Sequence, residues 1–117
     1  TGVQTCALPI FAVIQWFRIA YPRLILFAIP NAAKRSPQLA NYMKAEGMLA
    51  GVADLFLMKP NSKHHGMFIE MKAEKGLVSE KQEYFLQQAR HFGYHAVVCK
   101  GFEQAQAEII KYLRDVD

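Results

Sequence analysis

The chain has 117 residues and a mass of 13.3 kDa, so it forms one domain with room for one hydrophobic core. Hydrophobic residues make up 52% and charged residues 21% of it, a composition that excludes an intrinsically disordered chain. The formal net charge of +4 is unevenly spread, since residues 1–63 carry 7 basic and 2 acidic side chains and residues 64–117 carry 7 and 8. This asymmetry is typical of a surface that meets a polyanion, although a solvated basic face gives the same count.

The apolar segments and the cysteines indicate the cellular compartment of the protein. The longest apolar stretches, residues 7–14 and 24–30, are too short to span a bilayer, and no basic segment precedes the first of them. We therefore expect neither a membrane protein nor a secreted one. Cys6 and Cys99 cannot form a disulfide framework, so we expect a reducing, cytoplasmic setting.

The first ten residues, TGVQTCALPI, resemble the in-frame translation of a sequencing-library adapter. We expect residues 1–10 to be non-native and residues 11–117 to form the single domain. Such a segment is left out of fold reasoning, so Cys6 receives no functional role.

The first half of the domain alternates between helix and strand patterns. Residues 11–20 have helical periodicity, which ends before Pro22, and residues 24–29 predict a buried strand. Ser36 is an expected N-cap, with Pro37 at the first position of a helix that ends at Gly47. The side chains expected to face inward from this helix are those of Leu39, Ala40 and Met43.

The second half continues with a hairpin and a further helix–strand–helix unit. Strands are predicted over residues 52–58 and 67–72, joined by a turn, and then over residues 94–99. Helices are predicted from Ser79 to Gly93, with Phe85, Leu86, Ala89 and Phe92 on one side, and over residues 103–113. The order α-β-α-β-β-α-β-α predicts an α/β fold in which helices flank a mixed four-stranded sheet.

Three charged residues of the hairpin suggest a catalytic centre. Glu70 and Lys72 project to the same face of a strand, and the hairpin can place Asp54 beside Glu70. Two converging carboxylates repel unless a cation lies between them, and oxygen ligands of this kind suit Mg²⁺ or Mn²⁺. The spacing alone fits equally well a turn-capping Asp54 and a surface ion pair between Glu70 and Lys72.

The sequence around these residues resembles the VRR-NUC family, a branch of the PD-(D/E)XK nuclease superfamily. The resemblance extends from about residue 16 to residue 113, and its motifs occur in the family's order. They are KAEG at 44–47, GVADL at 51–55, FIEMK at 68–72, GLVSEKQ at 76–82 and GY at 93–94. The resemblance implies a restriction-endonuclease-like core and a DNA endonuclease that depends on Mg²⁺ or Mn²⁺.

The same resemblance implies roles for single residues. Asp54 and Glu70 match the metal ligands, the backbone carbonyl of Met71 is an expected further ligand, and Lys72 matches the catalytic lysine. Gln82 matches a glutamine beside the active site. Gln82 also completes a capping box with Ser79, and the two roles are compatible.

Two departures from the family pattern affect this assignment. Ala53 stands where relatives have a proline, a change in backbone shape rather than in chemistry. Relatives also carry a metal-binding glutamate on the first helix, whose expected place is around Cys6. The chain is therefore expected to lack one ligand, which would weaken activity without changing the fold.

Several basic and polar residues are candidates for contacts with DNA phosphates. A loop before a helix N-terminus can hold a phosphate through backbone amides and positive charge, and exposed lysines can add contacts. Each of these residues also fits a solvated surface. The candidates are Asn31, Lys34, Arg35, Lys44 and Lys75.

Taken with the resemblance, these features predict a Mg²⁺- or Mn²⁺-dependent endonuclease that is selective for branched DNA. Small stand-alone relatives resemble Holliday-junction resolvases and form homodimers, and a two-fold pair of active sites suits symmetric cleavage. A DNA-repair role in a bacterial or phage-infected cell would fit. The alternatives are a flap or nicking nuclease within a repair complex, and a catalytically weakened DNA-binding module.

Overall fold

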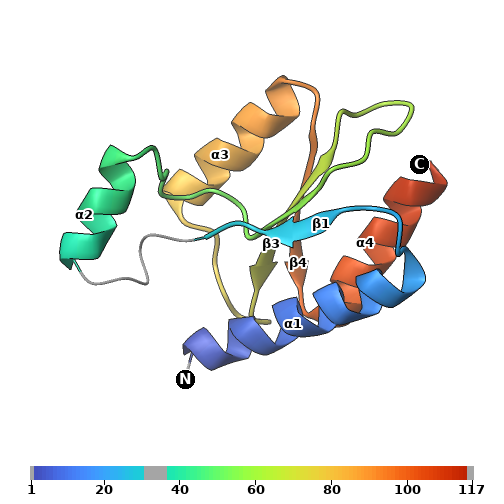
Figure 1. Cartoon of the computed structure of the whole chain (residues 1–117), viewed down its shortest axis with the longest axis horizontal. Coiled ribbons are helices and arrows are strands. Elements are labelled where there is room, and N and C mark those ends of the chain that lie inside the picture. Colours follow the sequence, from blue (N-terminus) through green and yellow to red (C-terminus); the bar gives the residue numbers. More distant parts are fainter. Residues whose placement is uncertain (1, 31–36, 116–117) are drawn as a thin grey trace.

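The computed structural model describes residues 2–30 and 37–115, with side chains from residue 9 onward except that of residue 40. The predicted order of helices and strands is confirmed (Figure 1). The elements are α1 (Gly2–Ala20), β1 (Leu26–Ala28), α2 (Pro37–Ala45), β2 (Leu55–Leu57), β3 (Met67–Lys72), α3 (Glu80–His91), β4 (His95–Lys100) and α4 (Phe102–Arg114).

The four strands form one mixed sheet in the order β1-β2-β3-β4. β1 pairs with β2 and β2 with β3 in antiparallel fashion, so β2 and β3 are the predicted hairpin. β4 runs parallel to β3, and α3 supplies the crossover connection that a parallel pair needs. β3 is thus a central strand with a neighbour on either side.

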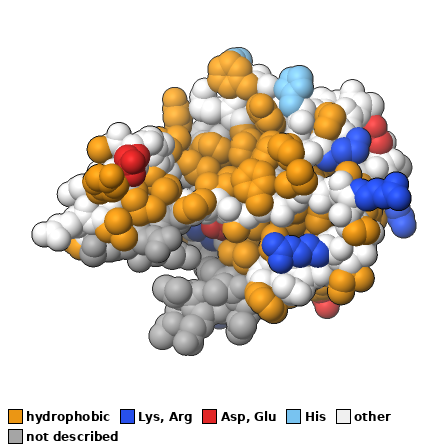
Figure 2. Space-filling model, in the orientation of Figure 1, with side chains coloured by type: hydrophobic (Ala, Val, Ile, Leu, Met, Phe, Trp, Pro, Cys, Tyr) orange, Lys and Arg blue, Asp and Glu red, His pale blue; other side chains and the backbone are white. Residues whose placement is uncertain are grey.

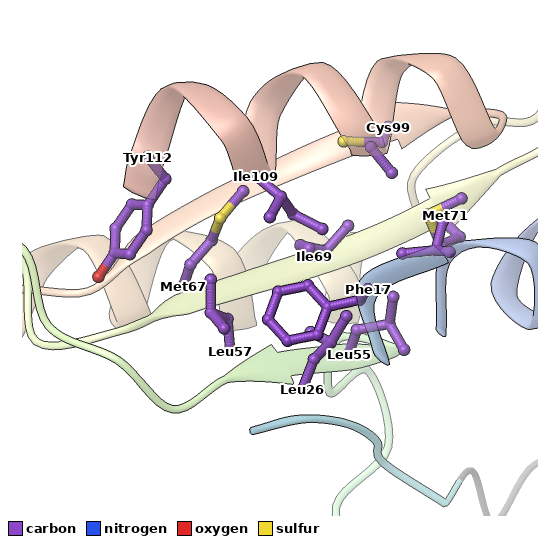
Figure 3. Packing of buried hydrophobic residues seen from close by; sticks show 12 residues of the cluster. Phe17, Leu26, Leu55, Leu57, Met67, Ile69, Met71, Cys99, Ile109 and Tyr112 are labelled. Carbon is purple, nitrogen blue, oxygen red and sulfur yellow. The ribbon is translucent and has the colours of Figure 1, made fainter. Parts of the chain in front are cut away.

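Alternate side chains of β3 serve different faces of the sheet. Met67, Ile69 and Met71 pack under α1 and α4, which lie side by side on one face. Figure 3 shows this core closing around Phe17 from α1 and Ile109 from α4. The core fixes the register of β3, because a shift by one residue would turn its polar side chains into the apolar layer.

The opposite face of the sheet carries a smaller core beneath α3. Leu86 and Ala89 of α3 are buried against Ala53 and Ala96, and Phe68 of β3 packs beside them. Glu70 and Lys72 follow Phe68 at intervals of two residues, so they lie on this face too. The sequence thus places the charged residues of β3 under the first turn of α3.

Several details differ from the sequence predictions. α1 begins at Gly2 rather than at residue 11, and β2 spans only Leu55–Leu57 of the predicted residues 52–58. The strand predicted over residues 24–29 is shorter and lies at the sheet edge, where Phe27 is 43% exposed, because the core beneath α3 does not extend to β1. Leu39 is exposed rather than inward-facing, since α2 stands apart from the sheet (Figure 1). Phe92 is also exposed, because it forms the C-cap of α3 beyond the sheet contact.

Throughout residues 2–30 and 37–115, no helix combines the length and the apolar character needed to cross a bilayer.

Candidate active site

Asp54 directly precedes β2 and is held by hydrogen bonds to the end of β1 and to β3. Its backbone carbonyl accepts a hydrogen bond from the Ile29 N–H at 2.8 Å, which ties it to the end of β1. Its carboxylate Oδ2 accepts from the backbone N–H of Met71 at 2.7 Å. Asp54 therefore points across to β3 and does not cap a local turn.

Glu70 is a buried carboxyl group in the middle of the sheet. Its residue is only 2% exposed, and its Oε1 is buried without a hydrogen-bond partner among the described residues. Its Oε2 accepts from Gln82 Nε2 at 3.2 Å and lies 3.6 Å from Lys72 Nζ. Burial, and next the charge of Asp54, raise the pKa of Glu70 from 4.5 to about 8.

Gln82 connects the helix cap to the charged residues. Its Oε1 accepts from Lys72 Nζ at 2.7 Å and from the Ser79 N–H at 2.9 Å, while Ser79 Oγ accepts from the Gln82 N–H at 3.2 Å. The capping box is therefore formed, and the same amide reaches both Lys72 and Glu70. The two roles predicted for Gln82 occur together.

The donor set of Asp54 and Glu70 fits a hard divalent cation. The two carboxyl groups lie close enough for the charge of Asp54 to raise the pKa of Glu70. A cation bound there would give Glu70 Oε1 the partner that it lacks among the described residues, and it would favour the ionised form of Glu70. Within the described part of the chain, no group of three His, Cys, Asp or Glu side chains gathers to hold a metal. The site thus offers two acidic side chains, and the third ligand expected near residue 6 falls where no side chain is described.

The remaining predicted residues lie outside this cluster. Lys44 lies in the last turn of α2 and Lys75 follows β3, and both are exposed. Asn31, Lys34 and Arg35 fall outside the described residues. Ala53, which replaces the family's proline, is buried in the core beneath α3. The contact of the Asp54 carboxylate with the Met71 N–H was not predicted, because no sequence pattern specifies which backbone amide a carboxylate will meet.

A family model described as the VRR-NUC domain matches residues 20–103, which include the whole cluster. The chain belongs to the VRR-NUC domain family. Membership implies a nuclease of the PD-(D/E)XK type and the ability to bind DNA. The predicted fold class is confirmed, because the mixed sheet with flanking helices is the one that a solved VRR-NUC domain protein shares.

That solved structure, described as a VRR_NUC domain protein, is 22% identical to the chain with a TM-score of 0.78. The match covers 96% of this chain and 90% of the other. A comparison with functionally curated proteins found no match. At this identity, the structural likeness supports the fold of the VRR-NUC domain, and the family model supports the nuclease class.

Proposed function

We propose that this VRR-NUC protein is a divalent-metal-dependent DNA endonuclease. The observation that carries the proposal is the buried Glu70, which has an orphaned oxygen and a raised pKa beside Asp54 and Lys72. A buried carboxyl group such as Glu70 destabilises a fold when it ionises. Its presence at this site therefore points to a ligand that the ionised carboxylate binds. A hard cation is such a ligand.

Asp54, Glu70 and the backbone carbonyl of Met71 would hold Mg²⁺ or Mn²⁺. The bound ion would supply charge neutralisation at the phosphate and a more acidic water. Lys72 would orient the attacking water and stabilise the charge that builds up on the phosphorus oxygens, since its ammonium lies at the edge of the same cluster. Gln82 would hold that ammonium in place through its amide oxygen. Attack by water would break the bond between phosphorus and the 3′ oxygen, which would leave a 5′ phosphate on one product and, after protonation, a 3′ hydroxyl on the other.

We propose branched DNA as substrate and a homodimer as the active form. The sheet face next to α3 is uncovered at β1 and β2, where Ile25, Phe27 and Met58 are exposed around Phe56. Figure 2 shows hydrophobic side chains gathered at the centre of this face of the molecule. An apolar patch beside an edge strand is typical of an interface between copies, and two copies would present paired active sites.

Basic residues would guide the DNA to the site. We propose that Asn31, Lys34, Arg35, Lys44 and Lys75 contact backbone phosphates, which makes binding sensitive to salt. A cytoplasmic role in DNA repair, in a bacterium or a phage-infected cell, is compatible with such a protein.

A catalytically weakened DNA-binding module is the second candidate. It is favoured by one finding, that only two acidic side chains meet at the site among the described residues. Such a module would bind DNA without Mg²⁺ and would not cut it.

Cleavage of DNAs of different shape tests the proposal. We expect the chain to cut a labelled four-way junction in Mg²⁺ or Mn²⁺, faster than it cuts plain duplex or single-stranded DNA of the same sequence, and not in EDTA. A labelled flap substrate distinguishes a resolvase from a flap nuclease, and light scattering reports whether the active species is a dimer.

The result has three readable outcomes. Paired cuts at the junction by a dimer support the resolvase-like form, and preferred cutting of the flap by a monomer supports the accessory form. Tight DNA binding without cleavage in either metal would overturn the endonuclease proposal in favour of the binding module.

A further inference from the structure

A hollow of about 620 Å³ lies between the segment that leads into β2 and the outer side of α3. Its volume is in the range of about 300 to 1,000 Å³ that is usual for small-molecule sites. Apolar groups form most of its lining, which also includes Lys81, Glu80 and Gln88. The apolar part consists of Leu49, Ala50, Tyr84 and Phe85.

Both walls of this hollow belong to chain segments that also carry active-site residues. Leu49 precedes Asp54 by five residues and Ala50 by four. On α3, Lys81 directly precedes Gln82, and Tyr84 follows Gln82 by two positions, on the other side of the helix. The loop is pressed against the helix at Gly51, whose φ is +90° and where an added Cβ would lie 2.7 Å from the backbone carbon of Lys81. The loop and the helix that form the hollow are therefore held in a fixed position relative to each other.

The hollow presents an aromatic ring to solvent next to a cation. Tyr84 is 68% exposed although it lies in the middle of a helix that packs on the sheet, and Leu49 across from it is also exposed. Lys81 lies one helical turn before Tyr84, so its ammonium is on the same side of α3. An aromatic face stacks on nucleobases and a neighbouring lysine pairs with phosphate, and single-stranded DNA sites combine these two groups.

We infer that the hollow takes an unpaired nucleobase of the substrate strand, stacked on Tyr84 with Lys81 against its phosphate. This inference rests on the proposed nuclease function and narrows its substrate to DNA with unpaired or openable nucleotides near the cleaved bond. A base inside a duplex has both faces covered by its neighbours, so it reaches an aromatic wall only after it leaves the stack. Flaps, bulges and opened junction centres supply such bases, and plain duplex does not.

The inference is tested without relying on cleavage by comparing the DNA affinities of protein variants on DNAs of different structure. Affinities of the parent chain and Tyr84→Ala are measured by fluorescence anisotropy in Ca²⁺, for a flap DNA and for fully paired duplex. We expect Tyr84→Ala to weaken flap binding about ten-fold and to change duplex binding by less than about two-fold. Tyr84→Phe keeps the ring and is expected to bind as the parent does.

An abasic scan of the unpaired strand locates the base. One abasic position is expected to weaken binding by the parent about as much as Tyr84→Ala weakens binding of the intact DNA. The same abasic position is expected to cause no further loss of affinity in Tyr84→Ala, because both changes remove the same contact. Phe92→Ala is the control, since Phe92 is 64% exposed at the other end of α3, outside the hollow. It is expected to leave flap binding unchanged.

Several results would overturn the inference. Additive losses at every abasic position, or equal losses on flap and duplex DNA, would show that Tyr84 does not stack on a base. A change of oligomeric state in Tyr84→Ala would identify a second copy of the chain as the occupant instead. If Tyr84→Ala and one abasic position are coupled in Ca²⁺ but the chain does not cut in Mg²⁺, the base-binding site stands and the nuclease proposal fails. If the chain cuts in Mg²⁺ but the two changes are not coupled, the nuclease proposal stands and the base-binding site fails.

Discussion

Replacing Lys72 by methionine is expected to lower the rate of DNA cleavage about a thousand-fold while DNA affinity stays within about two-fold. Methionine has nearly the length of lysine and keeps the packing of the aliphatic stem, but it has no charge. The ammonium lies 3.6 Å from Glu70 Oε2 and 2.7 Å from Gln82 Oε1, so it lies at the site and not in a general DNA-binding surface. Its loss should therefore affect the reaction more than binding.

Lys59→Met is the matched control for this prediction. Lys59 is exposed in the loop that follows β2, and its ammonium donates a hydrogen bond to the backbone carbonyl of the next residue, Pro60, at 3.3 Å. Single-turnover cleavage and anisotropy are measured for both variants. Equal cleavage by Lys72→Met and Lys59→Met, or a loss of DNA affinity as large as the loss of rate, would contradict a catalytic role for Lys72.

Replacing Glu70 by glutamine is expected to stabilise the metal-free protein increasingly as the pH rises. The pKa of Glu70 is about 8 in the fold against 4.5 as its ordinary value, so the unfolded chain releases the proton first. Between these two values the folded state binds more protons, and the free energy of unfolding of the parent therefore falls with rising pH. Relative to the glutamine variant, the fall approaches about 1.4 kcal/mol per pH unit and levels off above pH 8.

Urea unfolding in EDTA at several pH values across this window measures the effect. Glu74→Gln serves as control, because Glu74 is exposed in the loop after β3 and its substitution should leave the pH profile of the parent unchanged. Parallel profiles for the parent and Glu70→Gln would mean that Glu70 ionises normally in the fold, and the argument for a cation at this site would lose its basis.

Most of the fold follows from local patterns in the sequence. From Ile69 to Lys72, β3 alternates apolar and polar residues, which distinguishes its two faces, and the capping residue Ser79 marks the start of α3. The edge strand β1 was less well predicted, because a short apolar run gives no sign of whether a helix covers it. Leu39 was expected to be inward-facing for a similar reason, since periodicity shows which side of a helix is apolar but not whether a partner lies there.

The candidate site was predicted less completely than the fold. Asp54, Glu70, Lys72 and Gln82 were chosen from spacing and family resemblance, and the structure brings their side chains together. The orphaned oxygen of Glu70 could not be foreseen, because it depends on the packing of α3 over β3. The hollow at Tyr84 was missed as well, since an aromatic residue in an amphipathic helix is more often part of the core.

Metal-dependent catalysis at Asp54 is tested by the cleavage of a labelled four-way junction by the parent chain and by Asp54→Asn, in Mg²⁺ and after EDTA. This experiment joins residue, metal and reaction in one comparison. We expect the parent to cut in Mg²⁺, to stop in EDTA and to recover when the metal is restored. We expect Asp54→Asn to stay folded and to bind the junction without cutting it. Cleavage that persists in EDTA, or cleavage by Asp54→Asn at the rate of the parent, would contradict metal-dependent catalysis at Asp54.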